Sequence, residues 1–576
     1  MLSLLVLASL AAAPPPPSAS AFRWTERGVD VDVILDSLSV EQKVGQLMLV
    51  GFGGTQMDGT IATFLDEVRP GGVALFSRNI DSRAQTARLI GAVRAHDPVA
   101  RTRTGDTAVP LFVAVDQEGG NVVRLKNDAL VLPSAMALGA ANDVGLARAA
   151  GTVLGEDLRA WGFNMNLAPV LDVNSNPRNP VIGIRSFGAD PATVAELGVA
   201  YIRGLESAGV LAVAKHFPGH GDTDADSHYH LPVLPHDHDR LLAVELFPFA
   251  RAFAEGLPAV MTAHIALPAV AEGDIPATVS SRVLTDLLRT ELGYDGLVIT
   301  DGLEMQGIVE KYGSGEAAVR AVVAGADMVM VLWFPEKKRE VREKLLDAVR
   351  SGRIPRARLD QAVRRVLTAK ARHGLFETFS PPSVDDERAR EQRRSAVTRE
   401  IAERAVTIVK NDRGVLPLHQ GTTVLAAATE PLFLSELQKT LQVQAFTLSQ
   451  APTTARLERD AAQLIAQARR ADVIVIGMMN SDHAVLVHRV RRAHPNKKLV
   501  VVSFGTPYLL SHVGDVDAYV CAFGWREESE RAAGQVLVGK KPPRGRMPVT
   551  LPGVMTAGSQ TLLMSSPTPA RPVVAR

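Results

Sequence analysis

The chain has 576 residues, of which 46% are hydrophobic and 22% charged, so it has the composition of a globular protein and is too long for one ordinary domain. Its 63 basic and 62 acidic residues give a net charge of +1 and occur in mixed order. The charge pattern therefore indicates neither a nucleic-acid groove nor a polybasic membrane anchor. We expect two domains and a small, largely neutral partner molecule.

The N-terminus is typical of a secretory signal. Residues 2–13 form a short apolar run, four prolines follow, and the small residues 18–21 resemble a signal-peptidase site before Phe22. The run is too short to span a bilayer permanently. We expect residues 1–21 to be a signal-like segment of an exported bacterial protein. Because no Lys or Arg precedes the apolar run, a mis-assigned start and an uncleaved segment are the alternatives.

Eight short β-type runs recur over the first two thirds of the chain and alternate with helix-like segments. The runs are 44–52, 72–76, 111–115, 164–170, 210–214, 259–263, 296–300 and 326–332. The helix-like segments are 84–95, 143–160, 191–207, 239–254, 281–291 and 315–324. This alternation predicts a (β/α)8 TIM-like barrel over residues 22–380, with functional residues after the strand C-termini. A doubly wound open sheet is the structural alternative.

Acidic and basic side chains follow five of the predicted strands. They are Asp116 after the third, Asp172 after the fourth, Lys215 and His216 after the fifth, His264 after the sixth and Asp301 after the seventh. Each alone could be a helix cap or a buried ion-pair partner, but their shared position predicts a common pocket. Asp301 stands directly after a buried strand, which suits a carboxylate nucleophile.

Residues 215–228, KHFPGHGDTDADSH, gather acids, bases and turn residues in what we interpret as an active-site loop. Asp226 and His228 are one residue apart, so the carboxylate can orient the imidazole while its other nitrogen handles a substrate proton. Six of the fourteen histidines fall within 216–238, and a zinc site or a solvated loop is the alternative. The Pro-Gly between His216 and His220 disfavours the helical spacing of zinc ligands.

Residues 381–394 combine prolines with a charge run and predict a linker. A second domain over 395–555 opens with a helix through Ala405, and its apolar runs 406–410, 423–428, 472–478, 499–504 and 518–523 suggest an α/β sandwich. Residues 556–576 are expected to be a tail. Cys521 is the only cysteine, which excludes an intramolecular disulfide, and its apolar surroundings predict a buried side chain.

With these motifs the chain resembles glycoside hydrolase family 3, and within it the β-N-acetylglucosaminidases of the NagZ type. The strongest matches are KHFPGHGDTDADSHYHLP at 215–232 and VITDGLEM at 298–305, supported by VDQEGGNVVRL at 115–125, NLAPVLDV at 166–173, IRSFG at 184–188, AVTIVKNDRGVLPL at 405–418 and GKKPPRGRMPVTLP at 539–552. The resemblance implies that Asp301 is the nucleophile and that Asp226 and His228 are the acid/base dyad. It places sugar-binding roles on Asp116, Arg124, Arg185, Lys215 and His216, although the two arginines could instead be structural ion-pair partners.

The implied reaction is hydrolysis, with retention, of terminal β-linked N-acetylglucosamine (GlcNAc) from peptidoglycan fragments or chitin oligosaccharides. A β-glucosidase or exo-glucanase of the same family, which would lack the dyad, and a non-catalytic carbohydrate-binding protein are the alternatives. No cofactor and no metal are implied, and we expect the second domain to do no chemistry. Because a neutral imidazole does not repel an anion, phosphate could compete with water as the acceptor.

Overall fold

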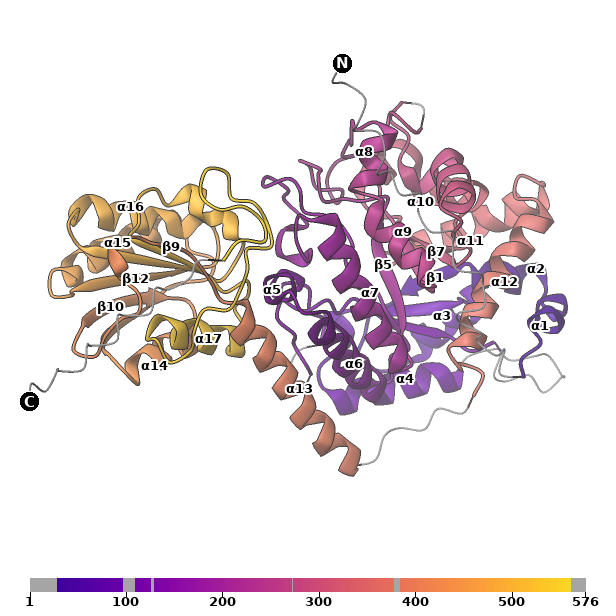
Figure 1. Cartoon of the computed structure of the whole chain (residues 1–576). Helices are drawn as coiled ribbons and strands as arrows, with labels where there is room; N and C mark the ends of the chain where they lie inside the picture. The colour runs from indigo at the N-terminus through magenta and orange to yellow at the C-terminus, as the bar shows by residue number, and fades with distance from the viewer. Residues whose placement is uncertain (1–27, 97–108, 126–128, 272, 378–383, 561–576) are drawn as a thin grey trace, which may run out of the picture.

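The computed structural model describes residues 28–96, 109–125, 129–271, 273–377 and 384–560, which form two domains side by side (Figure 1). The expected signal segment, residues 1–21, lies outside the described residues. No helix within the described ranges combines the length and the apolar character needed to cross a membrane.

The first domain is a closed parallel barrel of eight strands in sequential order. The strands are β1 (Met48–Gly51), β2 (Gly72–Leu75), β3 (Phe112–Val115), β4 (Met165–Asn166), β5 (Leu211–Phe217), β6 (Ala259–Thr262), β7 (Leu297–Gly302) and β8 (Met328–Val331). Pairing of Leu49 with Met330 closes the sheet between β1 and β8. The predicted TIM-like barrel is confirmed, and the open doubly wound alternative is wrong.

The strands β1 and β4 are much shorter than their apolar runs predict. The beginning of the run 44–52 belongs to helix α2 (Val40–Gln46), because Ser39 and Gln42 form a capping box that starts the helix just before β1. The run 164–170 gives only β4, and Pro169 within it has no N–H to donate to a ladder. The strand β5 is longer than predicted, so Lys215 and His216 lie within it.

Helices surround the barrel. They are α1 (Val31–Ser37), α2, α3 (Gly59–Val68), α4 (Arg83–His96), α5 (Ala135–Ala141), α6 (Val144–Trp161), α7 (Pro191–Ser207), α8 (His238–Ala243), α9 (Phe247–Ala254), the π-helix η4 (Arg282–Glu291), α10 (Gln306–Ala324), α11 (Pro335–Arg350) and α12 (Arg356–Arg372). The segment 239–254, expected as one helix, forms both α8 and α9. Proline is tolerated only in the first turn of a helix, and Pro248 occupies that position in α9.

Two layers of apolar side chains hold the barrel together. Phe112, Met165, Met261 and Ile299 belong to a buried cluster contributed mainly by the strands. A larger cluster includes the opposite faces of the same strands and the inner faces of the surrounding helices, with Trp161 among its fully buried members. Because both faces of the strands are covered, their sequences read as continuous apolar runs rather than as alternating patterns.

The second domain is a six-stranded sheet in the order β11-β10-β12-β13-β14-β9, in which β9 is antiparallel to β14. Its strands are β9 (Thr407–Asn411), β10 (Thr423–Ala428), β11 (Gln442–Thr447), β12 (Val473–Met478), β13 (Lys498–Ser503) and β14 (Ala518–Cys521). Its helices are α14 (Pro431–Gln438), α15 (Thr454–Ala468), α16 (Ala484–Ala493) and α17 (Glu527–Leu537). The predicted α/β sandwich is confirmed, and Cys521 is fully buried as expected.

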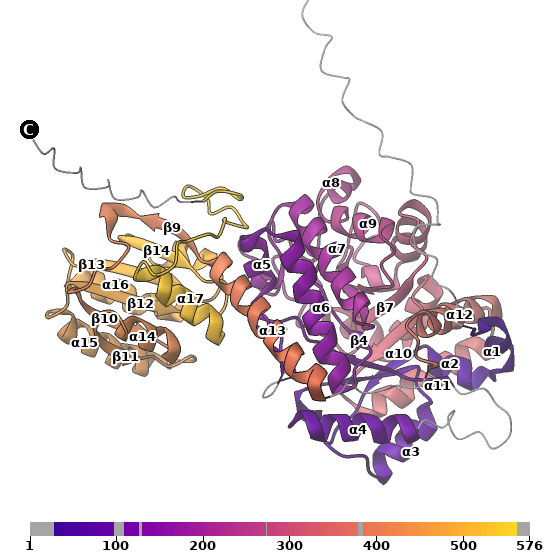
Figure 2. The ribbon, with the colours of Figure 1, turned by 60° about the horizontal axis from the view of Figure 1, so that its bottom comes forward.

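A long helix, α13 (Val384–Ala405), occupies most of the expected linker 381–394 and leads into the second domain. It packs along α6 of the barrel and also contacts α17 (Figure 2). The charge run forms ion pairs with the barrel, because Arg394 pairs with the buried Asp157 at 2.7 Å and Arg393 with Glu156 at 2.8 Å. From residue 384 onward, the expected linker is therefore a helix that docks on the barrel.

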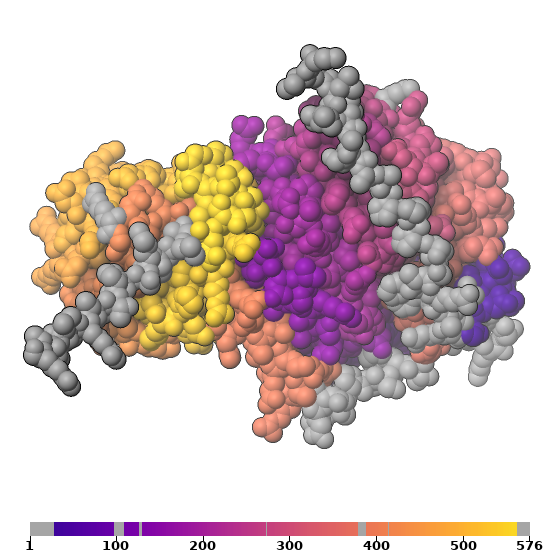
Figure 3. Space-filling view, in the orientation of Figure 1, coloured from indigo at the N-terminus to yellow at the C-terminus, as the bar shows by residue number. Residues whose placement is uncertain are grey.

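The C-terminal part of the second domain lies directly against the barrel (Figure 3). The N–H of Ala189 donates to the Pro548 carbonyl at 2.9 Å, and Gly188 permits this approach because a Cβ there would lie 2.6 Å from the same oxygen. The motif at 539–552 thus contains a docking segment. Residues 556–560 of the expected tail return to it, since Ser559 accepts the N–H of Met547 at 2.8 Å; the later ones lie outside the described residues.

Candidate active site

Five charged side chains from three neighbouring strands or their following loops form one ion-pair cluster at the C-terminal rim of the barrel. Lys215 on β5 lies 2.6 Å from both Asp116 and Glu118, which follow β3. Arg124 donates to Asp116 at 2.9 Å. Arg185, in the loop after β4, binds Glu118 through two parallel hydrogen bonds of 2.8 and 2.9 Å. The cluster unites four of the predicted sugar-binding residues with Glu118.

The electrostatics of this cluster keep its members charged. Burial alone would raise the pKa of the Glu118 carboxyl, but Arg185 and Lys215 outweigh burial and hold it well below its usual range. Burial would lower the pKa of Lys215, and the carboxylates of Asp116 and Glu118 raise it instead. Both arginines are ion-pair partners, as the sequence left open, and both pair with acids of the same rim. The Arg124 side chain keeps 30% of its surface exposed at this rim.

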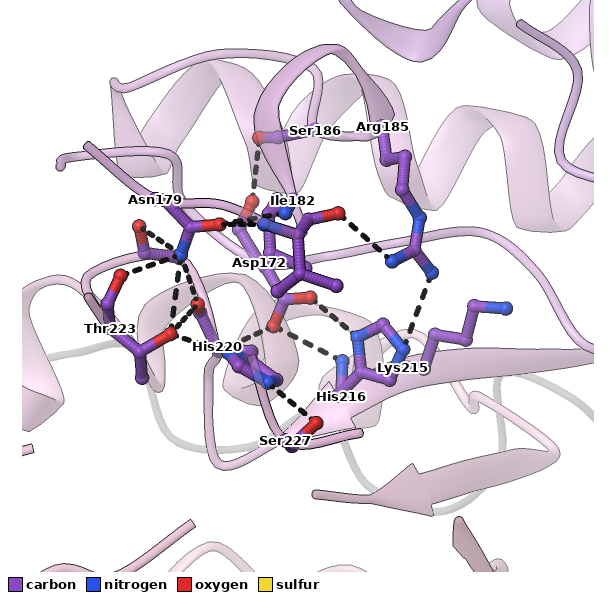
Figure 4. A network of polar contacts seen from close by, with 12 residues as sticks. Asp172, Asn179, Ile182, Arg185, Ser186, Lys215, His216, His220, Thr223 and Ser227 are labelled. Atoms are coloured by element: carbon purple, nitrogen blue, oxygen red, sulfur yellow. Dashed lines mark hydrogen bonds and ion pairs between the residues drawn. The ribbon is translucent and has the colours of Figure 1, made fainter. Parts of the chain in front are cut away.

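A second network surrounds the buried carboxylate of Asp172, which follows β4 (Figure 4). Its Oδ2 lies 2.7 Å from Nδ1 of His216, and its Oδ1 accepts the backbone N–H groups of His216 and His220 at 3.1 and 2.7 Å. Because a carboxylate only accepts, Nδ1 of His216 carries the proton and Nε2 points toward Arg185, 3.5 Å away. Asp172 thereby fixes the start of the loop that follows β5.

Asp301 is the penultimate residue of β7, and its Oδ1 accepts the N–H of Gly302 at 2.7 Å. Burial raises the pKa of this carboxyl, but the nearby imidazoles, His216 first, and the Gly302 N–H together bring it below its ordinary value. His264, after β6, donates from Nε2 to the Gly302 carbonyl at 3.0 Å. An ionised carboxylate is therefore held at the mouth of the barrel, as a nucleophile requires.

Asp226 and His228 lie on the loop after β5. Nδ1 of His228 is 2.7 Å from Oδ1 of Asp226, and the same oxygen accepts the His228 backbone N–H at 2.9 Å. The carboxylate thus holds the tautomer with the proton on Nδ1 and leaves Nε2 for a substrate proton. The loop is tied to the segment that begins α10, because Gln306 donates to the His228 carbonyl at 3.3 Å. The His228 side chain is 56% exposed, so a substrate can reach it.

The same loop is anchored by buried polar contacts. His220 lies between Thr223 and Ser227, with contacts of 2.6 and 3.0 Å to its two ring nitrogens. Burial lowers the pKa of His220 to about 4, so this imidazole is neutral near pH 7. His220 acts as a structural centre of the loop, which differs from the zinc-ligand role that we weighed for the histidine cluster.

Farther along the loop, Asp222, His236 and Glu245 bring donor atoms within 4.8 Å of one another, a spacing that suits a cation. Arg240 already lies among them, 2.7 Å from the buried Glu245 and 3.3 Å from Asp222. The guanidinium therefore supplies the positive charge that these carboxylates need, and we assign this group to anchoring the loop.

Sequence reasoning missed three contributors to the site. Glu118 stood in the matched motif at 115–125 but received no role, although its charge organises the first network. Asp172 was recognised at a strand end without an assigned function. Glu304, three residues after Asp301, accepts the N–H groups of Leu332, Trp333 and Phe334 at 2.5 to 3.0 Å and fixes the loop after β8. The signal for Glu304 was its place in the motif VITDGLEM.

A cleft of about 1950 Å³ separates the rim from the second domain. On the barrel side it is lined by residues 177–185, which include Arg185, and on the other side by loops of the second domain around Tyr508 and Trp525. Trp525 donates to Asn121 at 3.1 Å, and Asn174 donates to the Tyr508 hydroxyl at 3.2 Å. The second domain thus borders the approach to the barrel mouth.

Comparison with known families matches nearly the whole described chain. Residues 39–369 match the glycosyl hydrolase family 3 N terminal domain, and residues 406–567 match the glycosyl hydrolase family 3 C-terminal domain. The first of these matches covers more than half of the sequence and includes every barrel residue of the site described above. These matches confirm the resemblance to glycoside hydrolase family 3 that the sequence motifs indicated.

Individual relatives agree with this family. The chain is 30% identical over 541 residues to beta-hexosaminidase A of Pseudoalteromonas piscicida, with 84% of this chain and 89% of that protein aligned. It is 32% identical over 425 residues to a beta-N-acetylglucosaminidase/beta-glucosidase of Cellulomonas fimi, covering 71% and 70%. A solved family 3 beta-N-acetylglucosaminidase from Paenibacillus sp. str. FPU-7 superposes with a TM-score of 0.82 at 37% identity, covering 89% and 98%.

Proposed function

The chain belongs to glycosyl hydrolase family 3, and we propose that it is a retaining exo-β-N-acetylglucosaminidase in which Asp301 is the nucleophile and His228, oriented by Asp226, is the acid/base. The observation that supports this assignment is that a carboxylate and an oriented imidazole occur at the same rim of the barrel. An ionised carboxylate ends β7, and an imidazole with one nitrogen committed to Asp226 stands on the neighbouring loop.

The residues divide the reaction into two steps. In the first step His228 acts as the imidazolium, with a proton on each ring nitrogen. Asp301 attacks the anomeric carbon while Nε2 of His228 gives its proton to the glycosidic oxygen, so the leaving group departs and a glycosyl-enzyme forms. His228 is then neutral and keeps the proton on Nδ1 that Asp226 holds. Nε2 next accepts a proton from water, which attacks the anomeric carbon and releases the sugar with its original configuration. Asp116, Arg124, Arg185, Lys215 and His216 would bind the sugar hydroxyls.

The first test is hydrolysis of nitrophenyl β-N-acetylglucosaminide by wild type, Asp301→Ala and His228→Ala, with His230→Ala as a control on an exposed histidine of the same loop. We expect Asp301→Ala to lose at least about 1000-fold in kcat and His228→Ala about 100-fold or more, and His230→Ala to stay near wild type. Full activity of either catalytic variant would overturn the assignment, and a chelator should have no effect.

A β-glucosidase activity is the second candidate, because the Cellulomonas fimi relative carries both activities in its name. Parallel assays with the nitrophenyl glucoside separate the two. Preference for the N-acetylglucosaminide supports the proposal, whereas preference for the glucoside would replace it.

We further propose that the enzyme is exported and acts on GlcNAc ends of cell-wall fragments or chitin oligosaccharides. The support is the signal-like segment at 1–21, which would place the enzyme where such glycans occur. Mass measurement of the protein recovered outside the cytoplasm should show a chain beginning at Phe22. Digestion of purified muropeptides and chitin oligosaccharides in parallel then identifies the preferred leaving group.

A further inference from the structure

Two large aromatic side chains lie exposed on the loop after β8, where the barrel opens. Trp333 is 51% exposed and Phe334 is 54% exposed, although only Leu332 separates them from the fully buried strand β8. The Trp333 ring reaches across the end of β1 to the Phe76 ring after β2, with 4.9 Å between the centroids. The Trp333 ring therefore spans one sector of the barrel mouth.

The surroundings of Trp333 hold it in place. Glu304 accepts its backbone N–H at 2.9 Å, together with those of both neighbours. The Arg78 guanidinium lies 4.3 Å from the indole centroid, and hydrogen bonds of 2.8 and 3.0 Å to the carbonyls of Leu332 and Phe52 fix it there. An exposed aromatic ring that is fixed in this way keeps a surface ready for a ligand at little cost in conformational entropy.

The ring is also continuous with the charged rim. Arg124, which donates to Asp116, lies 5.6 Å from the centroid of the Phe76 ring. A chain of contacts therefore runs from the sugar-binding acid Asp116 through Arg124 and Phe76 to Trp333. The hydrogen bond from the Trp333 N–H to Glu304 also joins Trp333 to the segment just after the proposed nucleophile Asp301.

We propose that Trp333 is a platform for the sugar ring on the leaving-group side of the scissile bond. A β-linked GlcNAc ring carries its substituents equatorially, so each face presents axial C–H groups that stack on an indole. The charged cluster around Lys215 suits the hydroxyls of the terminal sugar, while the exposed Trp333 lies outside that cluster and is joined to it through Phe76 and Arg124, where the next ring of the chain would meet it. The inference deepens the proposed function, because it assigns the substrate class as disaccharides and longer chains.

The experiment compares two substrates that form the same glycosyl-enzyme. One is di-N-acetylchitobiose, whose leaving group is a GlcNAc ring, and the other is the β-N-acetylglucosaminyl fluoride, whose leaving group is fluoride. Because kcat/KM reports steps through departure of the leaving group, the platform affects only the first substrate. We expect Trp333→Ala to reduce kcat/KM about 10-fold or more on chitobiose and less than about 2-fold on the fluoride.

Trp333→Phe keeps a stacking ring and should recover most of the chitobiose activity. Phe334→Ala is the matched control, because it removes an equally exposed ring from the same loop and should leave the substrate ratio unchanged. Equal losses on both substrates, or an equal effect of Phe334→Ala, would overturn the platform. If the wild type cleaves neither substrate, the proposed function fails instead, and thermal denaturation shows whether each variant is folded.

Discussion

Glu430, in the second domain, is a buried carboxyl whose ionisation should lower the stability of the protein. The side chain follows β10, the residue is 3% exposed, and its Oε2 has no hydrogen-bond partner among the described residues. Burial, and then the nearby Glu530 carboxylate, raises the pKa of Glu430 to about 7. Glu530 itself accepts the N–H groups of Leu432 and Phe433, at the start of α14. Two acids therefore share the beginning of one helix.

The size and sign of the effect follow from the two protonation states. With a pKa of about 7 in the folded protein against 4.5 for an ordinary glutamate, ionisation of Glu430 opposes folding by about 3 kcal/mol. Between pH 4.5 and pH 7, Glu430 is ionised in the unfolded chain and still protonated in the folded protein. The stability that this carboxyl contributes is thus present below pH 4.5, decreases as pH rises, and is lost above about pH 7.

Replacement of Glu430 by Gln removes this dependence, because the amide does not ionise. Urea denaturation gives the free energy of unfolding of wild type and Glu430→Gln at pH 5 and at pH 8, and the change between the two pH values is compared for the two proteins. We expect the variant to gain roughly 2 to 3 kcal/mol relative to wild type on going from pH 5 to pH 8. Glu458→Gln, which changes an exposed glutamate of the same domain, should show no such gain. Equal pH dependence of Glu430→Gln and wild type would refute the reasoning. GlcNAc hydrolysis should be unaffected.

Three further predictions concern the site. Asp226→Asn should lower kcat on nitrophenyl β-GlcNAc by about 10- to 100-fold with little change in KM, because an amide holds the His228 imidazolium less strongly; an unchanged kcat would contradict it. Glu118→Gln leaves the buried cations short of one counter-charge and should cost about 3 to 5 kcal/mol in urea denaturation, whereas Glu255→Gln in the exposed pair with Arg203 should cost less than about 1 kcal/mol. At high phosphate, phosphorus NMR should detect GlcNAc phosphate beside free sugar, and hydrolysis without it would dismiss phosphate as an acceptor.

The fold was predictable where periodicity and length agreed. The helix expected at 191–207 is α7 with the same bounds, and the run 72–76 differs from β2 by one residue. The errors arose where a local signal outweighed the pattern. Pro248 divides one expected helix into two, and the edge strand β11 was missed because its side chains are largely exposed and it lacks an apolar run.

The site was predictable to the level of its strand ends and its loop. Position after a strand placed Asp116, Asp301 and the loop residues correctly, because parallel strands in a barrel end at one rim. The pairing of those residues was not predictable, since the contact between Glu118 and Arg185 joins positions 67 residues apart. The platform at Trp333 was also hidden, because the apolar run 326–332 gives no sign that the next two aromatic residues are exposed.

The two halves of the proposed catalytic site differ in how they are held, and this difference separates the expected effects of their variants. The cluster around Glu118 and Lys215 is largely buried and its acids and bases pair with one another, so a change there should alter the stability of the barrel as well as the proposed sugar binding. The dyad residue His228 is exposed and makes one side-chain contact, with Asp226, among the described hydrogen bonds. An acid/base that must first donate and later accept a proton needs this access, because both the leaving group and the incoming water approach it from solvent. Loss of kcat without loss of stability is therefore the signature that distinguishes the dyad from the ion-pair cluster.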